Sequence, residues 1–193
     1  MTTPGYFSLV LHSHLPYVIS HGRWPHGMDW LNEAAAETYI PLLETIDRLV
    51  VENISPKWTV GLTPILTEML DSDTFKSELD NYLASKIEAS ENDIEDFSRT
   101  GRTEMESLAT WWRDHFQHIF DLWEHRYEKD LVSHFKDRQD SGHIEIITCG
   151  ATHGYFPLLS EDISIQAQVK QGKASYKRHF GANIRPAKKI WSG

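Results

Sequence analysis

Three histidines follow apolar segments of the chain and could supply polar or catalytic groups. His12 and His14 come directly after the apolar run Leu9-Val10-Leu11, and His153 follows a later apolar run by a few residues. Imidazole exchanges protons near neutral pH, ligates divalent metals and donates hydrogen bonds, so a group of imidazoles can bind or catalyse. Each histidine taken singly is equally consistent with a packed, hydrogen-bonded side chain. Two or three imidazoles that converge favour a functional site.

The apolar runs predict three strands of a parallel sheet. The first is the nearly continuous apolar segment from Tyr6 to Leu11, which is typical of a strand buried on both faces. The second covers residues 57–62 and the third covers residues 143–148. We expect His12 and His14 to point to opposite faces of the strand, so that only one of them faces the interior. Because the carboxyl ends of parallel strands carry the active site in α/β folds, we expect the histidines on one rim.

Helices are predicted between these strands. Apolar side chains recur every three or four residues over 31–53, 73–97 and 103–131, and a short helix ends near Leu70. Ser160-Glu161-Asp162 supplies a cap and an acidic first turn for a further helix that runs to about Phe180. Pro41 predicts a kink or restart in the first helix, and Gly181 predicts a C-cap for the last. The two middle helices predict a helical insertion over about 73–140, an αα-hairpin on the barrel's flank. Residues 188–191 predict the start of a fourth strand.

This alternation predicts an α/β fold, a partial TIM-like barrel with about its first four strands in one domain over residues 1–193. Barrels of this kind need roughly 200 to 400 residues, so the length suits one domain or part of a larger one. Four strands cannot close a barrel, and the expected exposed edge is a candidate surface for self-association.

Composition excludes several classes of partner. The chain has 19 Lys and Arg against 28 Asp and Glu, and this net charge of -9 disfavours nucleic acid and anionic membranes. No apolar run approaches the roughly 18 residues of a membrane span. Residues 1–5 lack the features of a signal peptide, and Cys149 is the single cysteine. The expected location is therefore cytoplasmic.

One enzyme class follows from the first two histidines alone. An H-x-H pair after a first barrel strand is how metal-dependent hydrolases of the amidohydrolase type begin, with both imidazoles on a divalent metal. Such a site needs further ligands on later strands, and metal binding leaves the following Leu15-Pro16-Tyr17 unexplained. This hypothesis stays open as the lesser alternative.

Four blocks of the sequence carry a family resemblance. They are His12-Ser13-His14-Leu15-Pro16-Tyr17, residues 30–43 (WLNEAAAETYIPLL), residues 142–148 (GHIEIIT) and Ala151-Thr152-His153. In this order they resemble the N-terminal half of glycoside hydrolase family 57, and within it the 1,4-α-glucan branching enzymes. The resemblance extends to Arg185-Pro186 and Ile190-Trp191, so it covers nearly the whole chain.

The resemblance implies an incomplete (β/α)7 barrel and a retaining mechanism on α-glucans such as amylose or glycogen, with no cofactor and no metal. Two carboxylates about 5 Å apart would form and resolve a covalent glycosyl-enzyme intermediate. Carried over by motif, His12, His14 and His153 would contact the sugar, and Trp30 would match the family's glucan-stacking aromatic. Trp30 remains equally open to the simpler role of a loop aromatic at a helix start.

The family's catalytic carboxylates have no counterpart here. In the family's pattern the Ile-Trp of the fourth strand leads into Leu-Pro-Glu-Cys, whereas Ile190-Trp191 is followed by Ser192-Gly193. The other carboxylates have simpler interpretations: Glu145 lies within a strand, and Glu33 and Glu37 suit a solvated helix face. We therefore expect no catalytic residue, and a truncated branching enzyme that is inactive alone. The competing hypothesis is a non-catalytic glucan-binding or interaction protein.

Overall fold

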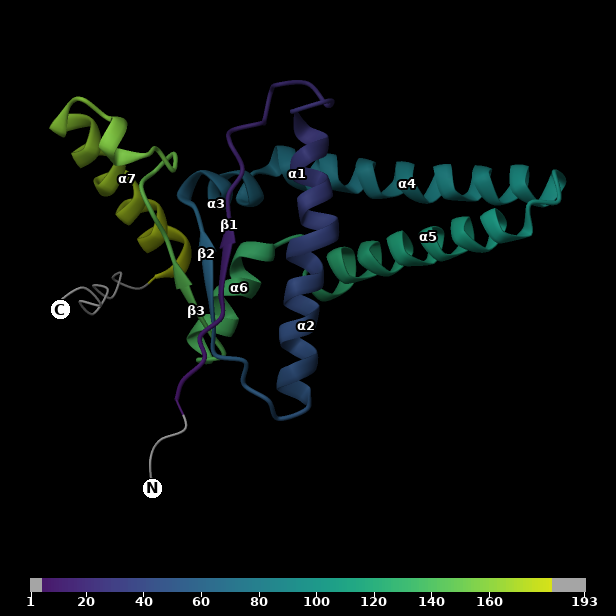
Figure 1. Ribbon diagram of the computed structural model, residues 1–193, viewed down its shortest axis with the longest axis horizontal. Coiled ribbons are helices and arrows are strands. Elements are labelled where there is room, and N and C mark those ends of the chain that lie inside the picture. Colours follow the sequence, from purple (N-terminus) through teal and green to yellow (C-terminus); the bar gives the residue numbers. More distant parts are fainter. Residues whose placement is uncertain (1–4, 182–193) are drawn as a thin grey trace. The chain divides into compact units, whose positions relative to one another are not determined.

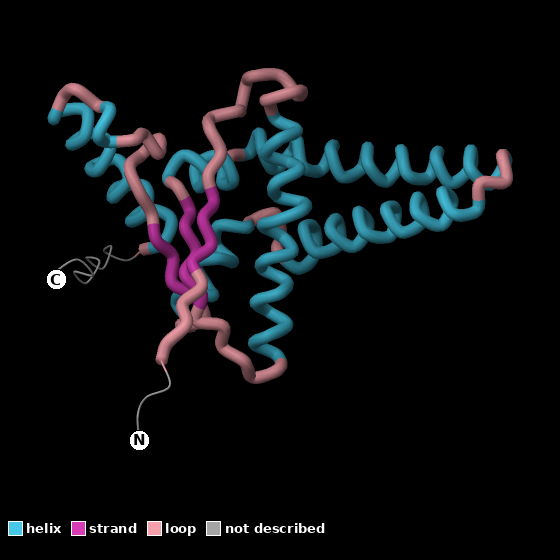
Figure 2. The backbone as a smooth tube through the Cα atoms, in the orientation of Figure 1, coloured by secondary structure: helices cyan, strands magenta, loops and turns pink. Residues whose placement is uncertain are grey.

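A computed structural model describes residues 5–181 and has an α/β fold (Figures 1 and 2). Three parallel strands form one sheet in the order β1-β2-β3: β1 is Val10–Ser13, β2 is Trp58–Leu62 and β3 is Ile144–Ile147. The predicted second and third strands are confirmed to within a residue or two at each end. The predicted fourth strand lies outside the described residues.

The described residues divide into two compact units. The first contains residues 5–17, 48–69 and 132–181 and holds the whole sheet. The second contains residues 18–47 and 70–131 and is helical. Within the described ranges, no helix is both long and apolar enough to span a membrane.

One face of the sheet is buried and the other is open. Register and strand alternation place two sets of side chains on opposite faces. The buried face carries Val60, Leu62, Ile144 and Ile146, which are at most 5% exposed. The open face carries Val10, His12, Thr59, Gly61, Glu145 and Ile147, of which Val10 is 56% and Ile147 42% exposed. Since parallel sheets are normally covered on both sides, this exposure is unusual.

The expectation that the first strand is buried on both faces is wrong. Tyr6 and Phe7 precede the strand and are 97% and 89% exposed. The apolar run suggested burial because hydrophobicity alone does not show which face is covered. Within β1 only Ser13 is buried and Leu11 is half-buried, whereas Val10 and His12 are exposed.

Four helical segments lie wholly or mostly in the first unit. They are α3 (Pro64–Asp71), α6 (Leu131–Asp140), the short 3-10 helix η3 (Phe156–Leu158) and α7 (Asp162–Phe180). Tyr176 of α7 donates a hydrogen bond to Ile146 O at 3.1 Å, and Gln139 of α6 accepts from Ile146 N at 2.9 Å. The main-chain N–H and C=O of Ile146 are therefore both hydrogen-bonded to side chains. Gly181 ends α7 with a φ of 69°, which confirms the predicted C-cap.

The first helical stretch is interrupted at the predicted place. It consists of α1 (Met28–Ala34), a π-helical turn η1 (Ala35–Tyr39) and α2 (Ile40–Val51). Pro41 follows the π-helical turn by two residues. Because proline has no N–H and its ring crowds the preceding turn, a widened turn at this point accommodates it.

The second unit contains the predicted αα-hairpin. Helices α4 (Asp73–Arg99) and α5 (Thr103–Asp121) run antiparallel through a short turn (Figure 1). Ser72 caps α4 by accepting a hydrogen bond from Phe75 N at 3.2 Å. Fully buried Phe75 and Trp123 contact each other edge-on, and the Trp123 indole donates to Asp80 at 2.7 Å.

The predicted continuation of this second helix to Leu131 is wrong. A π-helical turn η2 (Leu122–Arg126) follows α5, and the chain then turns, with positive φ at Glu128 and Lys129, before α6. Tyr127 and Leu131 are nevertheless fully buried, so the apolar spacing continues across the break. Ion pairs stabilise the break, since Lys129 pairs with Asp80 and Glu124, both at 2.8 Å. The apolar spacing gives no sign of these charged contacts.

Candidate functional site

The first two histidines lie together at the carboxyl end of β1. His12 is in the strand on the open face, and His14 follows the last strand residue, Ser13. Their rings both contact the His153 ring, with centroid distances of 4.9 Å and 4.4 Å. The expectation that only one of the pair faces the site is wrong, because residues two apart in an extended chain point to the same face, as His12 and His14 do here. We call His12, His14 and His153 the imidazole cluster.

The carboxyl end of β2 also reaches the cluster. Thr63 follows β2, and its hydroxyl lies 3.3 Å from His14 Nδ1. Thr63 N donates to Ser13 O at 3.4 Å, which ties the two strand ends together. Sequence reasoning missed Thr63 as a site residue. The available signal was its position, since it follows the second strand as His14 follows the first.

His153 is presented by a tight loop after β3. Its main-chain N–H donates to Gly150 O at 3.0 Å, and its φ is 59°. Cys149 lies beside it, with Sγ 3.2 Å from His153 Nδ1. A positive φ is uncommon for a residue with a Cβ and occurs at sites where neighbouring contacts hold the backbone. The predicted convergence of the three imidazoles is thus confirmed.

The surroundings of His14 favour its neutral form. Burial, and then the like charges of His153 and His12, lower the pKa of His14 below its ordinary value of 6.5. Burial raises the pKa of the Cys149 thiol, so the sulfur stays protonated. At neutral pH His14 is an uncharged ring with one donor and one acceptor nitrogen, which can hydrogen-bond to a neutral polar ligand.

This pKa shift predicts how stability depends on pH. A folded-state pKa below the unfolded value means that the unfolded chain binds more protons as pH falls. The contribution of His14 to stability is complete above about pH 6.5 and is lost as pH falls through the folded-state pKa. Urea unfolding at pH 7.5, 6.5 and 5.5 should show that the free energy of unfolding falls more steeply with decreasing pH in the wild type than in His14→Gln. Equal pH dependence in the two proteins would contradict the assignment.

The described residues offer the H-x-H pair no metal site. Within residues 5–181, no three His, Cys, Asp or Glu side chains are placed to hold a metal ion. The rings of the cluster contact one another by their faces and edges, with interplanar angles of 37° and 52° to His153. The arrangement fits hydrogen bonding by separate rings to a shared ligand.

Trp30 belongs to the second unit and lies at the start of α1. Its side chain is 39% exposed, and its ring centroid is 5.5 Å from that of His26. Glu33 and Glu37, one turn and two turns further on, are exposed, as a solvated helix face requires. Burial and the charges of these two carboxylates and Asp29 raise the pKa of Tyr82 to about 12.

One residue of the open sheet face adjoins the cluster, and a carboxylate lies on the same face beside Thr59. Gly61 pairs in register with His12, and a Cβ at Gly61 would lie 3.3 Å from His12 Nδ1. The bare backbone there leaves space for the imidazole. Glu145 lies on the same face and is exposed, so its side chain does not take part in the buried packing of β3.

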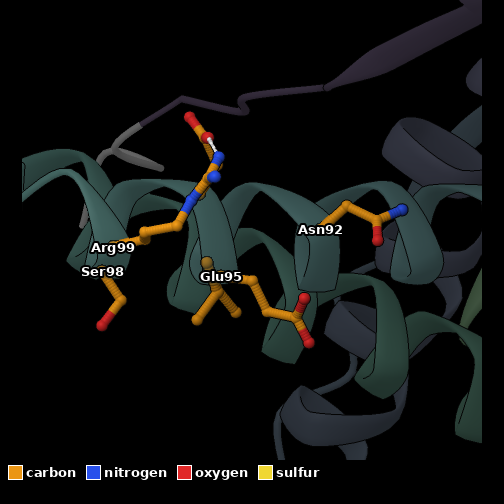
Figure 3. A pocket seen from close by; sticks show the side chains of 6 residues that line it. Asn92, Glu95, Ser98 and Arg99 are labelled. Atoms are coloured by element: carbon orange, nitrogen blue, oxygen red, sulfur yellow. Dashed lines mark hydrogen bonds and ion pairs between the residues drawn. The ribbon is translucent and has the colours of Figure 1, made fainter.

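A surface hollow elsewhere on the chain carries no comparable chemistry. It lies on α4 and is lined by Asn92, Ile94, Glu95, Asp96, Ser98 and Arg99 (Figure 3). Arg99 pairs with Asp96 at 2.7 Å, and both groups are on the exposed part of the helix. We take it as a solvated helix surface.

Comparison with known proteins identifies the relatives of this chain. The model of glycosyl hydrolase family 57 matches residues 8–191. A 1,4-α-glucan branching enzyme from Thermococcus kodakarensis is 38% identical over 187 residues, which are 97% of this chain and 26% of that protein. A probable 1,4-α-glucan branching enzyme from Mycobacterium tuberculosis is 42% identical over 82 residues, which are 42% of this chain and 16% of that protein.

Solved structures agree with this result. The crystal structure of a branching enzyme of this family from Pyrococcus horikoshii superposes with a TM-score of 0.88 at 36% identity, over 93% of this chain and 33% of that one. The crystal structure of an α-amylase from Thermotoga maritima superposes with a TM-score of 0.81 at 30% identity. The match covers 91% of this chain and 33% of that one. The chain thus spans about a quarter to a third of the length of the T. kodakarensis, P. horikoshii and T. maritima proteins.

Proposed function

Because the chain belongs to glycoside hydrolase family 57, we propose that its imidazole cluster contacts an α-1,4-glucan. The observation that carries this proposal is the convergence of three rings from two strand ends on one rim of a parallel sheet. Sugar hydroxyls are neutral donors and acceptors, and the uncharged ring of His14 offers them one donor and one acceptor nitrogen. Trp30, which is partly exposed, is the proposed stacking surface for a sugar ring.

The open sheet face supports the same proposal. Val10, His12, Gly61 and Ile147 lie on a face that a closed barrel would enclose, and exposed apolar atoms beside imidazoles suit the mixed surface of a sugar. We infer that the sheet forms part of an incomplete (β/α)7 barrel, with residues 1–193 as one portion of its domain and about 73–140 as an insertion. The exposed edge expected at the end of the partial barrel is the proposed surface for self-association.

The proposed reaction is that of the relatives named 1,4-α-glucan branching enzymes. It would cleave an α-1,4 linkage and form an α-1,6 linkage in a glycogen-like glucan, through two carboxylates about 5 Å apart. We propose that these 193 residues bind glucan without transferring it and that the two carboxylates come from outside them. The proposed location is the cytoplasm.

A non-catalytic binding or interaction protein is the second candidate function. The exposed Val10 and Ile147 on the open face favour it, because an uncovered apolar sheet face is a surface for a polypeptide partner. The two candidates differ in ligand: the first requires glucan affinity at the imidazole cluster, whereas an interaction protein requires none.

Calorimetric titration of the 193-residue chain with maltoheptaose tests the proposal. We expect saturable binding of maltoheptaose and none of cellohexaose, whose β linkages change the path of the sugar chain. An amylose branching assay on the same preparation should detect no α-1,6 linkages. Absence of maltoheptaose binding by the folded chain would reject the glucan site, and branching by the chain would reject its proposed inactivity.

A further inference from the structure

The loop that carries His153 is fastened to α7 by one residue. The main-chain carbonyl of Gln168 accepts a hydrogen bond from Ala151 N at 3.0 Å. Its side-chain amide accepts from Thr152 N at 2.9 Å and donates to Thr152 Oγ1 at 2.8 Å. One glutamine therefore makes three hydrogen bonds to the two residues directly before His153.

His153 depends on the geometry of this loop. Its φ of 59° is rarely adopted by a residue with a Cβ, and such a conformation persists only where contacts hold it. Its N–H closes a turn onto Gly150 O, and the intervening Ala151 and Thr152 are the residues that Gln168 holds. The side chain of His153 is exposed, so burial supplies little of the restraint.

A glutamine side chain suits this position. The amide offers an acceptor and a donor about one hydrogen-bond length apart, and Thr152 presents an N–H and a hydroxyl oxygen to match. Its neutral charge also leaves the imidazoles undisturbed. Gln166 and Gln171 lie on the same helix with exposed side chains, and either serves as a matched control.

We propose that Gln168 is a positioning residue that holds the His153 imidazole within contact distance of His12 and His14. Its effect on ligand binding rests on the proposed glucan function, whereas its effect on the geometry of the cluster does not. Within residues 5–181, Gln168 is the side chain that bonds both Thr152 N and Thr152 Oγ1, so its loss releases the loop and the His153 ring moves away from its two neighbours.

The test replaces Gln168 by methionine, which keeps the length of the side chain and removes both amide hydrogen bonds. The readout is the titration of the His14 Cε1–H signal by NMR in the full 193-residue chain. His14 is surrounded by His12, His153 and the protonated thiol of Cys149 near His153, and the charge of His153 contributes to its lowered pKa. We expect the midpoint of the His14 pH titration to rise toward 6.5 in Gln168→Met and to stay unchanged in Gln166→Met.

Maltoheptaose affinity gives a second readout, which we expect to fall about fivefold in Gln168→Met. Thr152→Val removes one of the same hydrogen bonds and carries the test if the first variant does not fold. An unchanged His14 titration in a folded variant overturns the proposal. If the titration changes but the wild type binds no maltoheptaose, the positioning role stands and the glucan function fails.

Discussion

Replacing Gly172 by alanine is expected to lower the free energy of unfolding by about 2 kcal/mol, although alanine favours helices. A Cβ at this position of α7 would lie 2.3 Å from the carbonyl oxygen of Cys149 and 3.6 Å from Ala151 N. Overpacking of this kind costs about 1 to 3 kcal/mol, and the contact with rigid backbone places the cost near the upper end. The gain in helix propensity, about 1 kcal/mol, does not offset it.

The same substitution should displace the loop that presents His153. Cys149 and Ala151 belong to that loop, so relief of the clash moves α7 away from it and stretches the hydrogen bonds of Gln168. Urea denaturation measures the stability, with Gly154→Ala as the control, because a Cβ there meets no atom closer than 3.9 Å. A Gly172→Ala chain as stable as the wild type would show that α7 is not tightly packed against the loop.

Replacing His12 and His153 together by alanine is expected to weaken maltoheptaose binding about thirtyfold. Each ring can make one hydrogen bond to a sugar hydroxyl, and the loss of two such bonds amounts to about 2 kcal/mol. Both side chains are exposed, so the free energy of unfolding should change by no more than about 0.5 kcal/mol. We leave His14 in place because it is half-buried and bonds with Thr63.

Calorimetric titration measures this loss, and His125→Ala provides the control, since that histidine is exposed in the second unit. The control should bind as the wild type does. Equal affinity of the double variant and the wild type would mean that the glucan is bound elsewhere on the chain.

Strand and helix positions could largely be predicted from the sequence because each has a local physical cause. Period-2 and period-3.6 hydrophobicity predict β2, β3 and α4, and residues at its two ends predict α7. The special backbone of Gly181 and Pro41 explains a helix end and a π-helical turn. The imidazoles could be placed on one rim because parallel strands end on the same side of a sheet.

The errors arose where a distant contact overrides a local pattern. The break after Arg126 is stabilised by Lys129 with Asp80, a residue far away in the sequence, while the apolar spacing runs on unchanged. The open face of the sheet could not be predicted, because apolar residues such as Val10 have the same pattern whether or not they are covered. Gln168 and Thr63 gave no signal as site residues, since their roles depend on which loop and strand end lie beside them.

Histidine-selective NMR during a maltoheptaose titration at pH 7.5 tests the central claim most directly. If the imidazole cluster contacts glucan, the Cε1–H signals of His12, His14 and His153 shift together and saturate with one dissociation constant. The signals of His115 and His118 on α5 then stay in place. Cluster signals that remain unmoved by millimolar maltoheptaose, while the chain is folded, would contradict the assignment of this rim as a glucan site.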